Sequence, residues 1–267
     1  MKKLLLLLFL GAQSLFAQKV KEQIYKEVDV TGSEMTLEVY NILGSIKVEG
    51  YAGNKILITV DKEITGITDD KEPFELGIEK KDNVVQVFTK TPYDSRNGSR
   101  NKSQQNIHLK YSIKVPHDIH LKLSTINSGD IEVARVNGTI HARNINGSIR
   151  ATEVKMPSDL QTINGEINIT YATNHLNGSV CKTLNGSIHV SCPAETSANI
   201  QLKTMNGHYY TDFSEDEMGR TQAVIPDKGK ESGRSKLNSE THITLGKGEC
   251  HMKFETMNGS IYIQKKM

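Results

Sequence analysis

Apolar and polar residues alternate on both sides of an Asn-Gly pair that recurs in the second half of the chain. In each copy the residue two positions before the glycine is apolar, and the residue two positions after it is apolar or aromatic; around Gly165 these are Ile163 and Ile167. The residue directly after the glycine is polar, as Glu166 is. Alternation of this kind predicts β-strands joined by turns. The predicted structural turns, one of them in a looser Asn-Ser-Gly copy, contain Gly129, Gly138, Gly147, Gly165, Gly178, Gly186, Gly207 and Gly259.

The kind of turn follows from which residues would face each other. An Asn-Gly pair between strands is a strong signal for a two-residue hairpin. Such a hairpin would place Leu184 opposite Ser187, and it would pair an apolar with a polar residue in every copy. A bend that directs both flanking apolar positions into one interior fits the pattern better. A three-residue hairpin loop, and with it an antiparallel meander, stays open.

The spacing of the turns favours a repeat architecture. Gly129, Gly147 and Gly165 are 18 residues apart, and Gly165, Gly186 and Gly207 are 21 apart. Gly138 and Gly178 fall between these, at a second corner. A period near 20 is typical of solenoids, in which each repeat buries its apolar face against the next. The sequence therefore predicts an all-β fold, an elongated single-stranded β-solenoid with coils of about 18–21 residues that stacks Asn on Asn and Ile on Ile about 4.8 Å apart.

The predicted domains follow the same pattern. The Asn-Gly repeats occupy residues 121–267, with a charged, Gly-containing insertion at about 213–236. Residues 18–120 form an irregular N-terminal β region, either first coils or a cap. Its predicted strands are Met35–Val39, Lys55–Val60, Asn83–Val87 and Ile107–Val115.

The first 17 residues have the pattern of a secretory signal peptide. Lys2 and Lys3 precede an apolar run that is too short to span a bilayer, and small residues follow it. We expect cleavage between Ala17 and Gln18 and export to the periplasm, the cell surface or the medium, with no transmembrane segment in the mature chain. The chain has 33 Lys and Arg and 31 Asp and Glu residues, and loss of Lys2 and Lys3 leaves 31 of each. This balance gives no charge signature for binding nucleic acid or anionic lipid.

The repeated Ile/Leu-Asn-Gly-Ser/Glu-Ile pattern behind a signal peptide resembles the putative-adhesin, β-strand-repeat family of uncharacterised bacterial envelope proteins. It is also similar to the auto-transporter adhesin head-domain-like family. The resemblance covers Ile126–Ile263 and, more loosely, Ile42–Val48. It implies an elongated β-solenoid and a cell-envelope adhesin, and it supplies no catalytic residues.

Candidate contact residues lie three positions after the glycine, on the predicted outer face. They are Arg150, His189, Tyr210 and Tyr262, with Glu132 and Asn168 in the same row. This row is either a flat contact surface for a glycan or protein, or a solvated outer face in which Glu132 and Arg150 pair.

Catalytic, cofactor and metal sites are not predicted. Asp130 and Glu166 would lie two strand spacings apart, roughly 9–10 Å, on an exposed face with nothing evident to raise either pKa. His117 and His120 would point to opposite sides of a strand. Cys181, Cys192 and Cys250 are either three free thiols or include one disulfide, for which Cys181 and Cys192 are the candidate pair.

These patterns predict an exported, non-catalytic binding or structural module whose partner is a surface glycan or an envelope protein. One alternative is a polysaccharide-active β-helix enzyme, a lyase or hydrolase. The other is an envelope accessory protein that binds a protein partner through its polar inserts, at Asp94–Gln105 and Ser214–Gly233.

Overall fold

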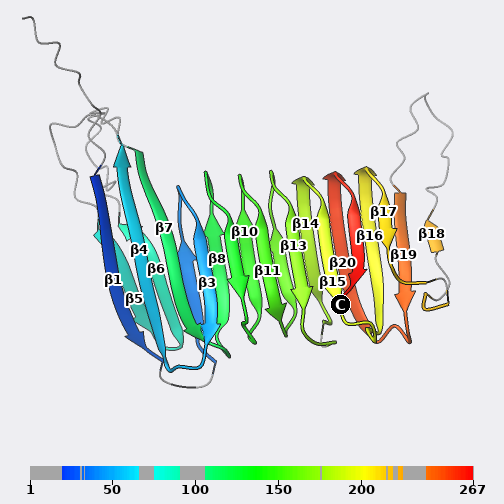
Figure 1. Cartoon of the computed structure of the whole chain (residues 1–267), viewed down its shortest axis with the longest axis horizontal. Helices are drawn as coiled ribbons and strands as arrows, with labels where there is room; N and C mark the ends of the chain where they lie inside the picture. Colours follow the sequence, from blue (N-terminus) through cyan, green and yellow to red (C-terminus); the bar gives the residue numbers. More distant parts are fainter. Residues whose placement is uncertain are drawn as a thin grey trace, which may run out of the picture.

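The chain forms two large β-sheets (Figure 1). Their inward side chains make a common core. The computed structural model describes residues 20–30, 32, 34–65, 75–90, 106–174, 176–214, 216–218, 222–224 and 239–266. The predicted signal peptide with its cleavage between Ala17 and Gln18 lies outside these ranges. So do the polar loop Asp94–Gln105 and most of the predicted insertion at 213–236. No helix in the described ranges has the length and apolar character needed to cross a membrane.

The first sheet has ten strands. In order across the sheet they are β1 (Val20–Asp29), β4 (Lys55–Thr65), β7 (Asn106–Pro116), β3 (Ile46–Tyr51), β9 (Ile131–Ala134), β11 (Ile149–Val154), β13 (Ile167–Tyr171), β15 (Ile188–Cys192), β21 (Ile261–Lys265) and β17 (Tyr209–Thr211).

The second sheet has eleven strands. In order across the sheet they are β18 (Gln222–Val224), β19 (Ser239–Leu245), β16 (Ala198–Asn206), β20 (Cys250–Asn258), β14 (Ser179–Asn185), β12 (Ser158–Gln161), β10 (Ile140–Asn144), β8 (His120–Thr125), β2 (Thr36–Tyr40), β6 (Val84–Lys90) and β5 (Glu75–Lys81).

The prediction of a single-stranded β-solenoid is wrong, because the chain forms two mixed sheets. Antiparallel pairs lie at both ends: β1–β4, β4–β7 and β5–β6 at one end, and β16–β19 and β18–β19 at the other. The spatial order also departs from the chain order, since β20 lies between β14 and β16, and β21 lies between β15 and β17. Gly259 therefore packs on Gly186, and Gly207 packs on Gly259. The last two strands of the chain, β20 and β21, are thus inserted inside the sheets and are not added at their ends.

The predicted stacking of like residues is confirmed in the middle of the first sheet, where the strands are parallel. Ile149 is paired with Ile131 and Ile167, and Ile188 is paired with Ile167 and Ile261. These isoleucines are fully buried. Parallel pairing at a shift of one repeat is what brings identical positions side by side.

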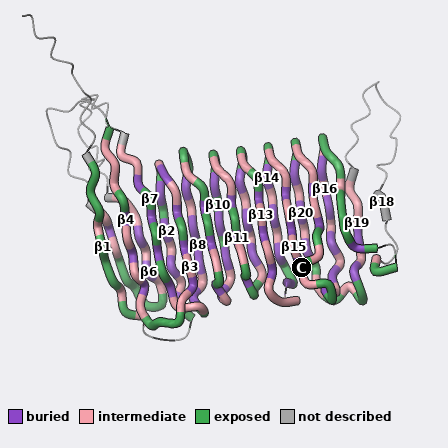
Figure 2. The backbone as a smooth tube through the Cα atoms, viewed as in Figure 1, coloured by how far each residue is buried: buried purple, intermediate pink, exposed green. Residues whose placement is uncertain are grey.

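The core follows from the alternation within each strand. Buried and less buried residues alternate along most strands, which appears as bands along the tube in Figure 2. The buried apolar side chains form one cluster from Met35 to Ile263, with Tyr171 and Phe254 among its largest members. Val, Ile and Leu dominate it, as expected for strands that pack one face against another sheet.

An ion pair joins Lys265, at the end of β21, to Glu217. The Glu217 carboxylate accepts a hydrogen bond from the Ser214 backbone N–H at 2.7 Å, and the Lys265 ammonium donates to both of its oxygens, each at 2.7 Å. The Lys265 ammonium also lies 5.2 Å from the centroid of the Phe213 ring, which is buried. Lys265, followed by Ser214, lowers the pKa of Glu217 to about 2.

This pKa predicts a pH-dependent contribution to stability. Because the pKa is depressed in the folded state, the contribution is present above the unfolded value of about 4.3 and is lost as the pH falls toward about 2. We expect Glu217→Gln to lower the melting temperature near neutral pH, and the gap to the parent protein to close between about pH 4.5 and pH 2. Thermal unfolding followed by circular dichroism across this range measures the gap. A gap that stays constant with pH would contradict the assignment.

Candidate functional site

The Thr-x-Asn-Gly turns are built from a hydrogen bond between repeats. The hydroxyl of Thr162 donates to the Gly147 carbonyl at 2.8 Å, and that of Thr183 donates to the Gly165 carbonyl at 2.9 Å. Thr125, Thr204 and Thr256 make the same bond, and the Asn144 side chain replaces it with an amide. All six side chains are buried or nearly so. The threonine is therefore an inward polar residue whose hydroxyl is satisfied by backbone.

The asparagines form a ladder of side-chain amides along the same corner. Asn164 donates to the Asn146 oxygen at 2.8 Å, and Asn185 donates to the Asn164 oxygen at 2.7 Å. The ladder continues through Asn258 and ends at Asn206, with 2.7 Å at both steps. Each internal amide both donates and accepts within the ladder, so the asparagines hold neighbouring turns together.

The glycines permit the close approach of successive turns. A Cβ atom on Gly165 would lie 2.2 Å from the Gly147 carbonyl oxygen, and one on Gly186 would lie 2.0 Å from that of Gly165. Gly129, Gly147, Gly207 and Gly259 are crowded in the same way by the turn beside them, and Gly138 is crowded by Ile119. Gly178 has open space around it but a φ of +88°. Each predicted turn glycine thus has a steric or conformational reason.

The residue between threonine and asparagine is exposed. The prediction that the apolar residues on both sides of each glycine face inward is therefore wrong for the apolar residue before the glycine in these turns. Ile126, Ile145, Ile163, Leu184 and Met257 are between 36% and 42% exposed, whereas the isoleucines two positions after the glycines are fully buried. Thr162 and Ile167 both point inward although they are five positions apart, so the turn shifts the strand alternation by one. The predicted inward direction does hold for Val136 and Leu176 at the second corner, which are fully buried.

The exposed residues make a continuous apolar row on the outside of the second sheet. We call it the aliphatic stripe, and its members are Ile126, Ile145, Ile163, Leu184, Met257 and the half-buried Met205, in the order of their strands. Each comes from a strand or turn at the end of β8, β10, β12, β14, β20 and β16. At the spacing of paired strands the stripe is about 24 Å long.

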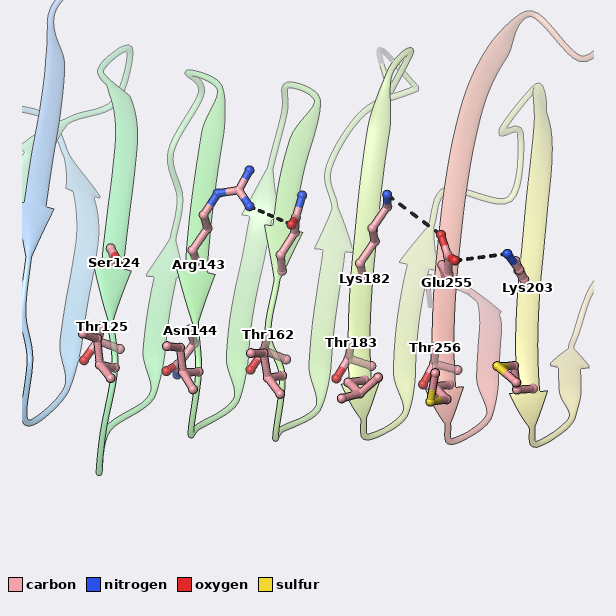
Figure 3. Close-up of a pocket in the computed structure, with 17 residues that line it drawn as sticks. Ser124, Thr125, Arg143, Asn144, Thr162, Lys182, Thr183, Lys203, Glu255 and Thr256 are labelled. Carbon is pink, nitrogen blue, oxygen red and sulfur yellow. Dashed lines mark hydrogen bonds and ion pairs between the residues drawn. The ribbon is translucent and has the colours of Figure 1, made fainter.

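A groove of about 810 Å³ runs along the stripe (Figure 3). Thr125, Thr162, Thr183 and Thr256 form part of its lining. On one side of them lies the stripe, and on the other side lies a second outward row, whose members precede the stripe residues by two positions. This second row, which we call the polar row, consists of Ser124, Arg143, Gln161, Lys182, Glu255 and Lys203.

The charges of the polar row are unevenly distributed. The Glu255 carboxylate lies 3.4 Å from Lys203, 3.9 Å from Lys182 and 3.8 Å from Lys253. One carboxylate thus faces three ammonium groups at the β14–β20–β16 end of the groove. Nearer the middle, Arg143 donates to Gln161 at 2.7 Å. Its guanidinium also lies 3.5 Å from Asp159. The groove therefore joins an apolar stripe to a locally cationic end.

Sequence reasoning did not find the groove. A usable signal is present in the three copies Lys182–Gly186, Lys203–Gly207 and Glu255–Gly259, which read KTLNG, KTMNG and ETMNG. In a strand, the first and third residues of each copy point to the same side. Lys182 and Leu184 therefore share the outer face once Thr183 is known to be buried.

The predicted contact residues do lie in one row on the outer face of the first sheet. Register pairs run from Arg150 through Asn168 to His189, and then to Tyr262 and Tyr210. The rings of His189 and Tyr262 stack with centroids 4.4 Å apart, and those of Tyr262 and Tyr210 stack at 4.9 Å. Both faces of the Tyr262 ring are therefore covered, whereas His189 and Tyr210 each stack on one face only.

The predicted pairing of Glu132 with Arg150 is replaced by another contact. Glu132 forms its ion pair with Lys47, at 3.6 Å on the neighbouring strand β3. Asp130 is one of the two carboxylates considered for catalysis, and it accepts a hydrogen bond from the Ser148 backbone N–H at 2.7 Å. Among the described residues no three His, Cys, Asp or Glu side chains are grouped as metal ligands.

The candidate disulfide between Cys181 and Cys192 is not formed, and all three cysteines are free thiols. Cys181 lies on β14 in the second sheet and Cys192 on β15 in the first. Facing sheets pack about 10 Å apart, whereas a disulfide needs Cα atoms about 4.4–6.8 Å apart. Burial raises the pKa of the Cys192 thiol to about 11 and that of Cys181 further, so neither is poised as a nucleophile.

No protein-family model and no curated protein matches this chain. Three solved structures resemble it. A "putative cell adhesion protein" from Clostridium sporogenes is 16% identical, with a TM-score of 0.47 over 92% of this chain and 100% of that chain. A "putative adhesin" from Bacteroides fragilis is 12% identical, with a TM-score of 0.30 over 92% and 97%. A "putative lipid binding protein" from Parabacteroides distasonis is 10% identical, with a TM-score of 0.28 over the same shares. Likenesses this distant establish no family.

Proposed function

We propose that this chain is a non-catalytic binding module of the bacterial cell envelope and that the groove along the aliphatic stripe is its binding surface. The observation that carries the proposal is the exposure of an apolar residue in every turn of the stripe. The neighbouring threonine, asparagine and glycine each have a structural role, but the position between Thr162 and Asn164 faces solvent and is nevertheless apolar. Contiguous exposed apolar surface marks interaction sites in soluble proteins.

Export rests on the N-terminal pattern ending at Ala17, which also supports an envelope location. A role without catalysis is supported by the state of the polar groups in the groove: the threonine hydroxyls donate to backbone carbonyls, and Glu255 is surrounded by ammonium groups. Neither arrangement supplies a general base. The row from Arg150 to Tyr210 is a weaker candidate for glycans, because sugar stacking requires free ring faces and the stacking of His189, Tyr262 and Tyr210 covers four of their six faces.

The proposal is tested by changing the stripe without changing the core. We expect the double variant Ile163→Asn, Leu184→Asn to bind the neutral apolar dye Nile red at least about tenfold more weakly, since each apolar contact is worth about 1 kcal/mol or more. Fluorescence titration measures the affinity. The matched control is Met156→Asn, an exposed methionine between β11 and β12 that does not line the groove. Equal losses in both variants, or no loss in either, would remove the groove as the binding surface.

A further inference from the structure

We propose that the groove binds a single-chain anionic amphiphile, a long-chain fatty acid, with its alkyl chain along the aliphatic stripe and its carboxylate among Lys182, Lys203 and Lys253. This inference rests on the proposed function and names its ligand class. Three properties of the groove support it: the state of its polar groups, the shape of its apolar surface and the position of its charge.

The polar groups beside the stripe are already satisfied. The threonine hydroxyls donate to glycine carbonyls, and the asparagine amides bond to one another along the ladder. The backbone of the central strands is paired on both sides within the second sheet. An extended peptide brings one donor and one acceptor per residue and would leave them without partners here. An alkyl chain brings none, so this surface favours it.

The shape of the stripe matches one linear chain. Each strand contributes a single aliphatic side chain, and the row continues across six adjacent strands for about 24 Å. Flexible Met257 and Met205 at one end adapt to irregular apolar partners. The lining residues of the groove contain no aromatic ring. A narrow aliphatic row of this length suits one alkyl chain better than a broad membrane surface.

The charge lies where a head group would be placed. Lys182, Lys203 and Lys253 surround Glu255 at 3.4–3.9 Å. Lys203 is also the register partner of Glu240 on β19, so three ammonium groups face two carboxylates and the cluster keeps an excess of positive charge beside Leu184, Met257 and Met205. The side chains of the three lysines and of Glu255 are between 30% and 42% exposed, so a ligand can reach the lysines. The attraction of a carboxylate to partly exposed ammonium groups is modest and weakens with salt.

The experiment compares dansyl-undecanoic acid with dansyl-undecanol, two fluorescent probes that differ in the charge of one end. We expect the acid to bind about tenfold more tightly at low salt, and the difference to shrink at about 0.5 M sodium chloride. The variant Lys182→Gln, Lys203→Gln should lose the preference for the acid while binding the alcohol as before. The matched control, Lys47→Gln, changes an exposed lysine on the opposite sheet and should keep the preference.

The outcomes separate this inference from the proposed function. Equal binding of acid and alcohol, both weakened by Ile163→Asn, Leu184→Asn, would overturn the fatty acid and leave the groove as the binding surface. Displacement of the acid probe by an acidic peptide at equal concentration would overturn it as well. If the stripe variant binds Nile red and both dansyl probes like the parent protein, the proposed function fails too. The fold of each variant is verified by circular dichroism, since all substituted residues are partly exposed.

Discussion

Replacing Gly165 by alanine is expected to destabilise the protein by more than about 4 kcal/mol, which places it among the severe single substitutions. The added Cβ would lie 2.2 Å from the Gly147 carbonyl oxygen and 2.5 Å from its carbon. Both atoms belong to backbone in the neighbouring turn, so no side chain can move aside. Relief requires separating two turns and with them the bond from Thr162 to Gly147 and the amide pair of Asn164 and Asn146.

The matched control is Gly178→Ala, in an Asn-Gly turn at the second corner. A Cβ at Gly178 meets nothing within 4 Å, but the φ of +88° is unfavourable for alanine. We expect a loss of only about 1 kcal/mol there. Thermal unfolding followed by circular dichroism should therefore show a drop of about 10 °C or more for Gly165→Ala and about 2–4 °C for Gly178→Ala. Similar drops for both would mean that the turns do not pack as closely as the structure places them.

The strands were predictable because alternation is a local property. The four predicted N-terminal strands correspond to β2, β4, β6 and β7, and the Asn-Gly copies mark turns. The order of the strands was not predictable, because the two copies of Thr-Met-Asn-Gly are identical. Thr256 and Thr204 offer the same hydroxyl to the turn beside them, so either repeat could follow the one at Thr183. Long-range pairing, including the antiparallel ends, decides between them, and no local pattern records it.

The groove escaped prediction because the turn hides a change of direction. Apolar residues on both sides of each glycine gave no reason to direct one inward and the other outward. The deciding residue is the threonine before them, which a hydropathy pattern places in solvent. Thr162 is buried because its hydroxyl donates a hydrogen bond to the Gly147 carbonyl in the neighbouring turn, a partner that exists only after the sheets have formed. The row from Arg150 to Tyr210 could be predicted because its members lie within regular strands, where simple alternation places them on the outer face.

The second large effect is expected from Ile167→Ala, compared with Ile163→Ala. Both isoleucines flank Gly165, but Ile167 is fully buried and Ile163 is 42% exposed. Truncating a buried isoleucine leaves a cavity and costs about 2–5 kcal/mol. Truncating the exposed one should cost less than about 1 kcal/mol. Urea unfolding of the two variants measures the difference in the free energy of unfolding.

The result decides what the stripe is for. If Ile163→Ala costs as much as Ile167→Ala, the stripe packs within the protein and its apolar character is explained by stability. If it costs little, stability does not account for an isoleucine, leucine or methionine at this position in all six turns of the stripe. A loss of probe binding in Ile163→Asn, Leu184→Asn then cannot be attributed to unfolding. Comparing two isoleucines that flank the same glycine thus distinguishes a residue that stabilises the sheets from one that is available to a ligand.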